Sequence, residues 1–236
     1  MQGLVRYEFA DGIATLTMDD GKANAMGIAM LQAIDAALDR AQDDQAVVVL
    51  AGRERMFSGG FDLAVFKGEP EALVRMLEAG ARLTRRLLAF PRPVLAVCTG
   101  HAIAMGAFVL LSADVRLGVD QGARIQVNEV QIGLTLPRFA IEVCRQRLAP
   151  EHLTLAAVTA LPYAPQQAVV AGFLDEVVPA AALADATSEG AARLAKLDAP
   201  SFAATKLRLR HDTLARLDRA IADDVFDWQS RFGRCA

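Results

Sequence analysis

The sequence predicts an α/β fold, in which helices cover a parallel or mixed β-sheet. Apolar runs rich in β-branched residues, such as 46–51 and 94–97, are typical of buried strands. Segments whose apolar residues recur at helical spacing, such as 26–42 and 70–90, alternate with these runs. Because neighbouring parallel strands are joined by long crossover connections, this alternation indicates strand–helix–strand units.

The first half of the chain is predicted to start with a hairpin and then to alternate helices with strands. Asp11-Gly12 favours a tight turn between the first two strands. Pro91 and Pro93 end a helix, because proline lacks the N–H that a continuing helix needs. The expected elements are strands 4–9, 13–18, 46–51 and 94–97 and helices 26–42 and 70–90.

The second half is predicted to be mostly helical. Gly172 is placed as the C-terminal cap of one of these helices. The expected elements are strands 114–118 and 123–127, a helix that follows the small-residue turn and ends near 111, and helices 137–148, 150–160, 165–172, 181–197, 200–210 and 213–228. Since no linker-like composition separates them, we expect a single α/β core over 1–180 with a C-terminal helical region over 181–236 that serves trimerisation.

Composition excludes several classes of function. Of the 236 residues, 53% are hydrophobic, which is enough for a large core. The net charge of −3 and the absence of a basic run argue against a nucleic-acid partner. The N-terminus is charged where a signal peptide would be apolar, so we expect a cytoplasmic protein without a membrane partner. Three cysteines without metal-ligand spacing predict free thiols and no metal site.

Two glycine-containing loops are the candidate site. In the first, 56–63, Gly59 and Gly60 follow a predicted strand and allow successive backbone N–H groups to face one acceptor. In the second, 93–108, a small-residue turn leads from a strand into an apolar helix, whose N-terminus favours negative charge. Together the two loops can form one oxyanion hole.

Five segments, in order, resemble the crotonase (enoyl-CoA hydratase/isomerase) superfamily and cover nearly the whole chain. The two glycine loops resemble its oxyanion loops, and the resemblance implies its fold, the ClpP/crotonase ββα superhelix. The other segments resemble its N-terminal coenzyme A segment, its acid/base segment and the turn before its C-terminal helices: Asp20-Gly21-Lys22-Ala23-Asn24-Ala25-Met26, Asn128-Glu129-Val130-Gln131-Ile132-Gly133 and Asp175-Glu176-Val177-Val178-Pro179.

The resemblance implies an enzyme that binds acyl-CoA thioesters and stabilises an enolate oxygen with backbone N–H groups. By position, these donors belong to Phe61 and Met105, and backbone donors do not depend on the identity of the side chain. The resemblance implies no separate cofactor, because coenzyme A is part of the substrate. It also implies a homotrimer, which can pair into a hexamer. The expected substrate or coenzyme A contacts are Lys22, Ala23, Ala25, Gly59, Gly60, Phe61, Asp62, Leu63, Met105 and Phe108.

The sequence departs from the family pattern where the reaction is decided. Hydratases of this family use two glutamates; Glu129 matches the second, and Phe108 stands where the first is expected. The glycine-rich segment usual after Pro137 is also changed, which implies an altered acyl pocket. The residues after Trp228 do not match the family's last basic segment, so its phosphate-binding lysine is expected to be absent or substituted.

Three functions follow as alternatives. A lone glutamate favours a Δ3-to-Δ2 enoyl-CoA isomerase, in which Glu129 is the catalytic base. Overall similarity to the family leaves an enoyl-CoA hydratase, a lyase that adds water to 2-enoyl-CoA, as the second alternative. The third belongs to a different class, a non-catalytic acyl-CoA-binding or assembly protein. Acyl chain length and pathway are not determined by the sequence.

Overall fold

The N-terminal hairpin forms at the predicted place. In the computed structural model, which describes residues 3–232, β1 (Val5–Ala10) pairs antiparallel with β2 (Ile13–Met18). The turn residues Asp11 and Gly12 have φ values of 51° and 74°. Because aspartate and glycine tolerate left-handed backbone better than most residues, this dipeptide fixes the hairpin.

The larger sheet is mixed, as predicted. It has six strands in the order β1-β2-β3-β5-β7-β9, and every pair after the first is parallel. Its remaining strands are β3 (Val47–Ala51), β5 (Val94–Cys98), β7 (Val115–Val119) and β9 (Glu176–Val178). The three consecutive parallel pairings of β2, β3, β5 and β7 confirm the crossover connections inferred from the alternating pattern.

A second sheet, which the sequence pattern did not reveal, carries the candidate loops. It consists of β4 (Arg55–Ser58), β6 (Gly100–Ile103) and β8 (Ile125–Gln126), all parallel. The prediction of non-strand structure at 55–58 and 100–103 was wrong, because these strands are too short and too rich in small and polar residues to show alternation. The chain thus repeats two strands and a helix, sending the first strand to the large sheet and the second to the small one.

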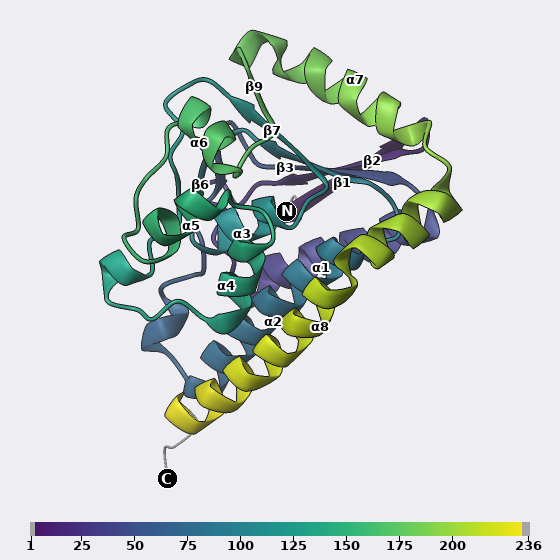
Figure 1. Ribbon diagram of the computed structural model, residues 1–236. Helices are drawn as coiled ribbons and strands as arrows, with labels where there is room; N and C mark the ends of the chain where they lie inside the picture. Colours follow the sequence, from purple (N-terminus) through teal and green to yellow (C-terminus); the bar gives the residue numbers. More distant parts are fainter. Residues whose placement is uncertain (1–2, 233–236) are drawn as a thin grey trace.

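Helices cover both faces of the large sheet (Figure 1). Val47 and Val49 point to a small core shared with α7 (Leu183–Ala195), whereas Val48 and Leu50 point to the main core. The helices α1 (Ile28–Asp43), α2 (Pro70–Ala89) and α3 (Met105–Leu111) supply residues to the main core. Shorter elements complete this side: η1 (Val65–Lys67), η2 (Val130–Ile132), α4 (Arg138–Arg145), α5 (Pro150–Ala157) and α6 (Pro165–Ala171). The short η3 (Ala180–Ala182) leads into α7.

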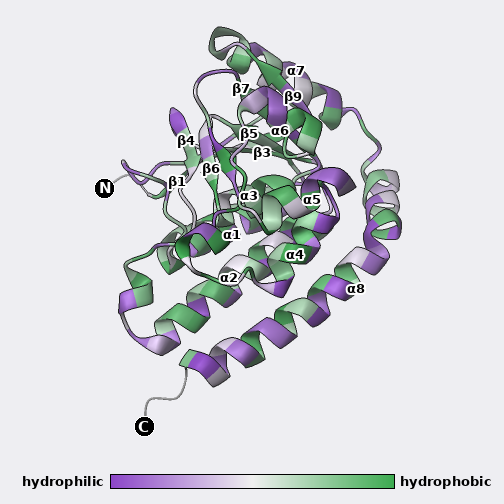
Figure 2. Cartoon of the chain, turned by 60° about the vertical axis from the view of Figure 1, so that its left-hand side comes forward, coloured by the Kyte–Doolittle hydropathy of each residue, from purple (hydrophilic) through white to green (hydrophobic). Residues whose placement is uncertain are grey.

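The chain ends in one long helix, α8 (Ala199–Phe232), where two helices were predicted. Nothing between Arg210 and Thr213 breaks a helix, and buried side chains continue on both sides, at Arg210 and Leu214. The inner face of α8 packs against α2 and α4 along the outside of the molecule, as Figure 2 shows, and its outer face exposes Leu207, Leu209 and Phe226 among polar residues. Within residues 3–232 no helix is both long enough and apolar enough to cross a membrane.

Candidate functional site

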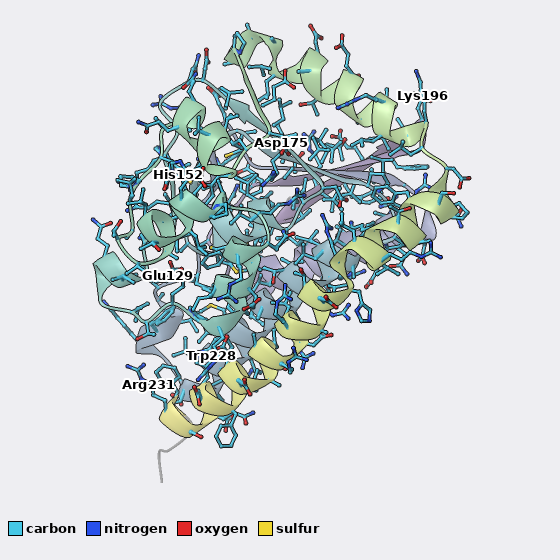
Figure 3. All side chains as sticks on the ribbon, viewed as in Figure 1. Glu129, His152, Asp175, Lys196, Trp228 and Arg231 are labelled. Atoms are coloured by element: carbon cyan, nitrogen blue, oxygen red, sulfur yellow. The ribbon has the colours of Figure 1, made fainter. Side chains whose placement is uncertain are left out.

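A cavity lies where the two glycine loops, the η2 turn and the end of α8 meet. Its walls are mainly apolar, and Glu129 is the carboxylic acid among the described lining residues. Figure 3 shows Trp228 and Arg231 near the end of α8, with Glu129 above them on the same side of the molecule. The lining residues are Gly59, Phe61, Leu63, Phe66, Leu77, Ala104, Phe108, Asn128, Glu129, Ile132, Leu134, Thr135, Pro137, Trp228, Arg231 and Phe232.

The two glycine loops touch each other through backbone that leaves no room for a side chain. Gly60 has φ of 97°, and a Cβ at this position would lie 2.9 Å from the Cβ of Ala104 and 3.0 Å from the carbonyl oxygen of Ile103. Ala104, the residue before α3, has φ of 50° and ψ of −119°, a strained backbone conformation for alanine. The sequence prediction that both loops form one site is consistent with this contact.

The side chains of the two expected donors, Phe61 and Met105, meet at Gly80 of α2. A Cβ on Gly80 of α2 would lie 2.6 Å from the Phe61 ring and 3.2 Å from the Met105 sulfur, so both side chains pack against this glycine. Neither the Phe61 N–H nor the Met105 N–H has an acceptor within residues 3–232. Two such donors in one place can stabilise a developing oxyanion.

The N-terminal segment is tied to the first loop by Asn24. This side chain is fully buried and its amide donates hydrogen bonds to the carbonyl oxygens of Met18 and Phe57, while Ser58 Oγ donates to the Asn24 carbonyl. The N–H of Gly59 donates to the Ala23 carbonyl at 2.7 Å. The segment expected to contact coenzyme A therefore lies directly beside the first loop.

Glu129 follows β8 and begins the η2 turn at the wall of the cavity. Its exposed fraction is 7%, and its Oε2 atom is buried with no hydrogen-bond partner in the described chain. Burial raises the pKa of this carboxyl from 4.5 to about 7, because desolvation penalises the charged form. A carboxyl that titrates near neutral pH can both take and return a proton.

Phe108 belongs to an aromatic cluster beside Glu129. Its ring meets the Phe139 ring edge to face at a centroid distance of 5.8 Å, and Phe139 meets Trp228 in the same way at 6.3 Å. Phe108, Phe139 and Trp228 come from α3, α4 and α8, so the cluster joins three helices around the cavity. Phe108 and Trp228 line the same cavity as Glu129, so aromatic rings form part of the apolar wall around this carboxyl.

The predicted site residues do not all reach the cavity. Its lining includes Gly59, Phe61, Leu63, Phe108 and Glu129. Gly60, which forms the contact between the loops, and Met105, the first residue of α3, are not among the lining residues. Asp62 is not among them either, and its carboxylate accepts a hydrogen bond from the Ala64 N–H. Lys22, Ala23 and Ala25 lie in the neighbouring segment, where the N–H groups of Lys22 and Ala25 donate to the Asp20 carboxylate.

Sequence reasoning missed the part of the wall that α8 and the segment 132–137 provide. Trp228, Arg231 and Phe232 lie far from both loops in sequence, and helical periodicity marks them only as part of an amphipathic face. Gly80 was also missed, although a glycine inside a helix destabilises it by ~1 kcal/mol and therefore points to a packing requirement.

Comparison with known proteins identifies the family. Residues 8–232 match the family described as enoyl-CoA hydratase/isomerase. The chain belongs to this family. A probable enoyl-CoA hydratase of Rhodobacter capsulatus is 30% identical over 204 residues, which are 86% of this chain and 79% of that protein. The crotonase fold expected from the sequence is thus confirmed, and acyl-CoA thioesters are the substrates of the family.

Solved structures of family members superpose closely on this chain but carry different activity names. A hydratase/isomerase family protein from Pseudomonas syringae gives a TM-score of 0.93 at 42% identity, covering 94% of this chain and 97% of that one. A Mycobacterium tuberculosis protein gives 0.91 at 41% identity, covering 96% and 99%. That protein is called an enoyl-CoA isomerase in one structure and a probable enoyl-CoA hydratase in another. Family membership therefore establishes the substrate class and leaves the reaction to the geometry of the site.

Proposed function

We propose that the protein is a Δ3-to-Δ2 enoyl-CoA isomerase that uses Glu129 as its single acid/base group. The observation that carries this proposal is the cavity itself, in which Glu129 is the carboxylic acid among the described lining residues. Phe108, which the family resemblance aligns with the first glutamate of hydratases, lines the same cavity. A 1,3-proton shift can use one base on one face of the substrate. Addition of water benefits from two groups, one to orient the water and one to exchange the α-proton.

In this mechanism the thioester carbonyl accepts hydrogen bonds from the N–H groups of Phe61 and Met105. The Glu129 carboxylate takes a proton from C2 of a 3-enoyl-CoA, and the C2–H electron pair forms the C1–C2 double bond of the enolate. Glu129 then returns the same proton to C4 while the electrons re-form the thioester carbonyl and the C2–C3 double bond. Atoms and charge balance, and each oxyanion donor contributes ~2.7–4 kcal/mol to the barrier reduction.

Hydration is the second candidate. Oε2 of Glu129 and Oδ1 of Asn128 are both buried at this cavity without a partner in the described part of the chain. Two neighbouring acceptors can orient one water molecule, which is the task of the missing second glutamate. The hydratase names of several relatives agree with this alternative.

The decisive experiment compares the two reactions in one protein. Isomerisation of 3-hexenoyl-CoA raises the absorbance through conjugation, and hydration of crotonyl-CoA lowers it. We expect efficient isomerisation, weak hydration, and loss of isomerisation by ~10²–10⁴ in Glu129→Gln. Efficient hydration by the wild type would establish the second candidate instead, and isomerisation that survives Glu129→Gln unchanged would refute the assigned role of Glu129.

We further propose that coenzyme A lies against the segment 22–25 and the first loop, and that the active species is a homotrimer. Calorimetry with acetoacetyl-CoA and acetoacetate tests the first part, since the free acid lacks every contact beyond the acyl group. Equal affinity for the two would contradict a thioester site. If neither enoyl-CoA is turned over while acetoacetyl-CoA still binds tightly, the protein is a non-catalytic acyl-CoA binder.

A further inference from the structure

The end of α8 forms one wall of the Glu129 cavity. Trp228 is 9% exposed, lines the cavity and contacts the Phe139 ring, which in turn contacts Phe108. Phe232, one turn further along the same helix face, also lines the cavity. A wall made of an indole and a phenyl ring has no group that an acyl chain could hydrogen-bond, so it acts through its shape and volume.

The position of this wall is fixed by Asp224, which lies one turn before Trp228. Asp224 is 3% exposed, and its carboxylate accepts hydrogen bonds from the backbone N–H groups of Arg138 at 3.0 Å and Phe139 at 2.8 Å. These are the first two residues of α4, which has no capping side chain of its own. A carboxylate at a helix N-terminus satisfies unpaired donors and interacts favourably with the helix dipole.

Besides the Phe139–Trp228 ring contact, α4 and α8 are joined by ion pairs that are at least partly exposed. Arg138 also pairs with Asp227 at 2.6 Å, and the side chain of Asp227 is half exposed. Arg216 pairs with Glu142 near the other end of α4. Exposed ion pairs of this kind contribute only ~0–1 kcal/mol. The buried Asp224 bonds are therefore the contact that sets how α8 sits on α4.

From these contacts we infer that Trp228 closes the far end of the acyl pocket and determines which acyl chain lengths the protein accepts, and that Asp224 is the positioning residue that holds it there. The inference rests on the proposed acyl-CoA site. It assigns the protein to short-chain substrates, because a chain that extends past the Glu129 region meets the indole. A pocket without this wall would gain affinity about fourfold for each methylene buried.

Saturated acyl-CoAs test the wall without any turnover. Calorimetry measures the dissociation constants of butanoyl-, octanoyl- and dodecanoyl-CoA for the wild type and for Trp228→Ala, Trp228→Phe and Phe226→Ala. Phe226 is the matched control, because it lies on the same helix but is 69% exposed and does not line the cavity. We expect the wild type to bind butanoyl-CoA more tightly than dodecanoyl-CoA.

In Trp228→Ala the affinity for dodecanoyl-CoA relative to butanoyl-CoA rises at least tenfold, in Trp228→Phe by less, and in Phe226→Ala not at all. Butanoyl-CoA binding shows that each variant is folded, and Trp228→Phe provides the test if the alanine variant is not. A wild type that prefers dodecanoyl-CoA, or an unchanged ratio in both Trp228 variants, overturns the inference. If the wild type binds none of the three thioesters, the proposed acyl-CoA site itself is wrong.

A second set of three variants separates positioning from simple stabilisation. Asp224→Asn keeps one acceptor for the α4 N–H groups, Asp224→Ala keeps none, and Asp227→Asn removes only the exposed pair. We expect the dodecanoyl-to-butanoyl affinity ratio to rise severalfold in Asp224→Ala, to rise less in Asp224→Asn and to stay at the wild-type value in Asp227→Asn. Loss of stability in Asp224→Ala with an unchanged ratio would show that Asp224 has no positioning role.

Discussion

At the scale of single residues, the proposed mechanism makes the pH dependence of the enzyme follow the ionisation of Glu129. Its pKa of about 7 means that the carboxylate needed to take the first proton is the minor form in mildly acid solution. We therefore expect kcat/KM for 3-hexenoyl-CoA to rise with pH and to level off above pH 7. Since the same group returns the proton, no second titrating group should lower the rate between about pH 7 and about pH 9. A bell-shaped profile would indicate two catalytic groups.

The raised pKa of Glu129 also affects folding stability. Because the folded pKa lies above the ordinary value of 4.5, the stability linked to this proton is present below pH 4.5 and lost as pH rises through about 7. Such a shift corresponds to roughly 3 kcal/mol. Urea unfolding should therefore show Glu129→Gln to be more stable than the wild type at pH 8, by up to that amount, and little different at pH 4.5. A less stable glutamine variant at pH 8 would show that the carboxylate is not desolvated.

The proposed function gives Phe108 the role of deciding between isomerisation and hydration. Its ring is buried beside the cavity and packs on Phe139, so it excludes the second carboxylate that hydration needs. We expect Phe108→Glu to hydrate crotonyl-CoA at least tenfold faster than the wild type, as followed by loss of absorbance. Phe108→Gln is the control, since it has similar size and no charge. Equal hydration by the glutamine and glutamate variants would argue against a general-base role for the new carboxylate.

Residue identities could be predicted only where a local pattern marks them. Glu129 and the glycines of the first loop stand in segments that resemble family motifs, and the structure places Gly59 and Glu129 at one cavity. Trp228 and Asp224 carry no local pattern, because their importance depends on which residues of α4 they meet. Gly80 could have been noticed as a glycine in a long helix, but the ring that it accommodates belongs to Phe61 of another segment.

At the scale of elements, the contact between the two loops depends on Gly60. A Cβ there would clash with backbone and Cβ atoms of the second loop, and φ is 97°, so Gly60→Ala should cost ~1–3 kcal/mol of stability. It should also lower isomerase activity by separating the Phe61 and Met105 N–H groups. Gly59→Ala is the matched control, because its Cβ would approach Ala23 only to 3.3 Å and φ is not positive. Thermal unfolding and kcat measure both effects, and equal losses in the two variants would contradict this account.

The elements themselves were predictable to the extent that their signals are local. Asp11-Gly12 fixed the hairpin, and the β-branched run at 47–50 identified β3. The strands β4 and β6 escaped prediction because they are defined by pairing with each other, at Arg55 with Gly100 and at Ser58 with Ala102. The continuity of α8 escaped for a similar reason, since burial against α2 keeps the segment near 211 helical.

At the scale of the whole molecule, a buried charge cluster joins α8 to the sheet. Asp114 at the start of β7 accepts hydrogen bonds from the Val94 N–H and from Lys206 at 2.8 Å, and pairs with Arg210 at 3.0 Å. Burial lowers the pKa of Lys206 to about 8, although Asp114 opposes the shift. These contacts make Asp114 a structural carboxylate. Lys206 and Arg210 place two charged side chains of this cluster on the buried face of α8. The apolar residues of α8 lie partly in the core and partly on the outer surface.

The exposed apolar side chains of the molecule indicate where copies of the chain could assemble. Much of the apolar face of α8, including Leu214 and Leu217, is buried within its own chain and is not available to a partner. Leu209 remains 81% exposed, with Leu207 also exposed nearby, and a separate apolar surface lies on α5 and α6 at Val158 and Val170. Exposed apolar side chains of this number are typical of an oligomer interface.

We expect light scattering to give a mass near three times 25.2 kDa, and Leu209→Lys to reduce it, because a charge at the centre of an apolar contact loses its hydration without a partner. Val170→Lys is the matched control: it places the same charge on the α5–α6 surface, and Val170 is 69% exposed in the single chain. Dissociation in Val170→Lys alone would move the interface to that surface and away from the C-terminal helix. A stable monomer of the wild type at micromolar concentration would contradict the trimer, and the exposed α8 leucines would then require another partner.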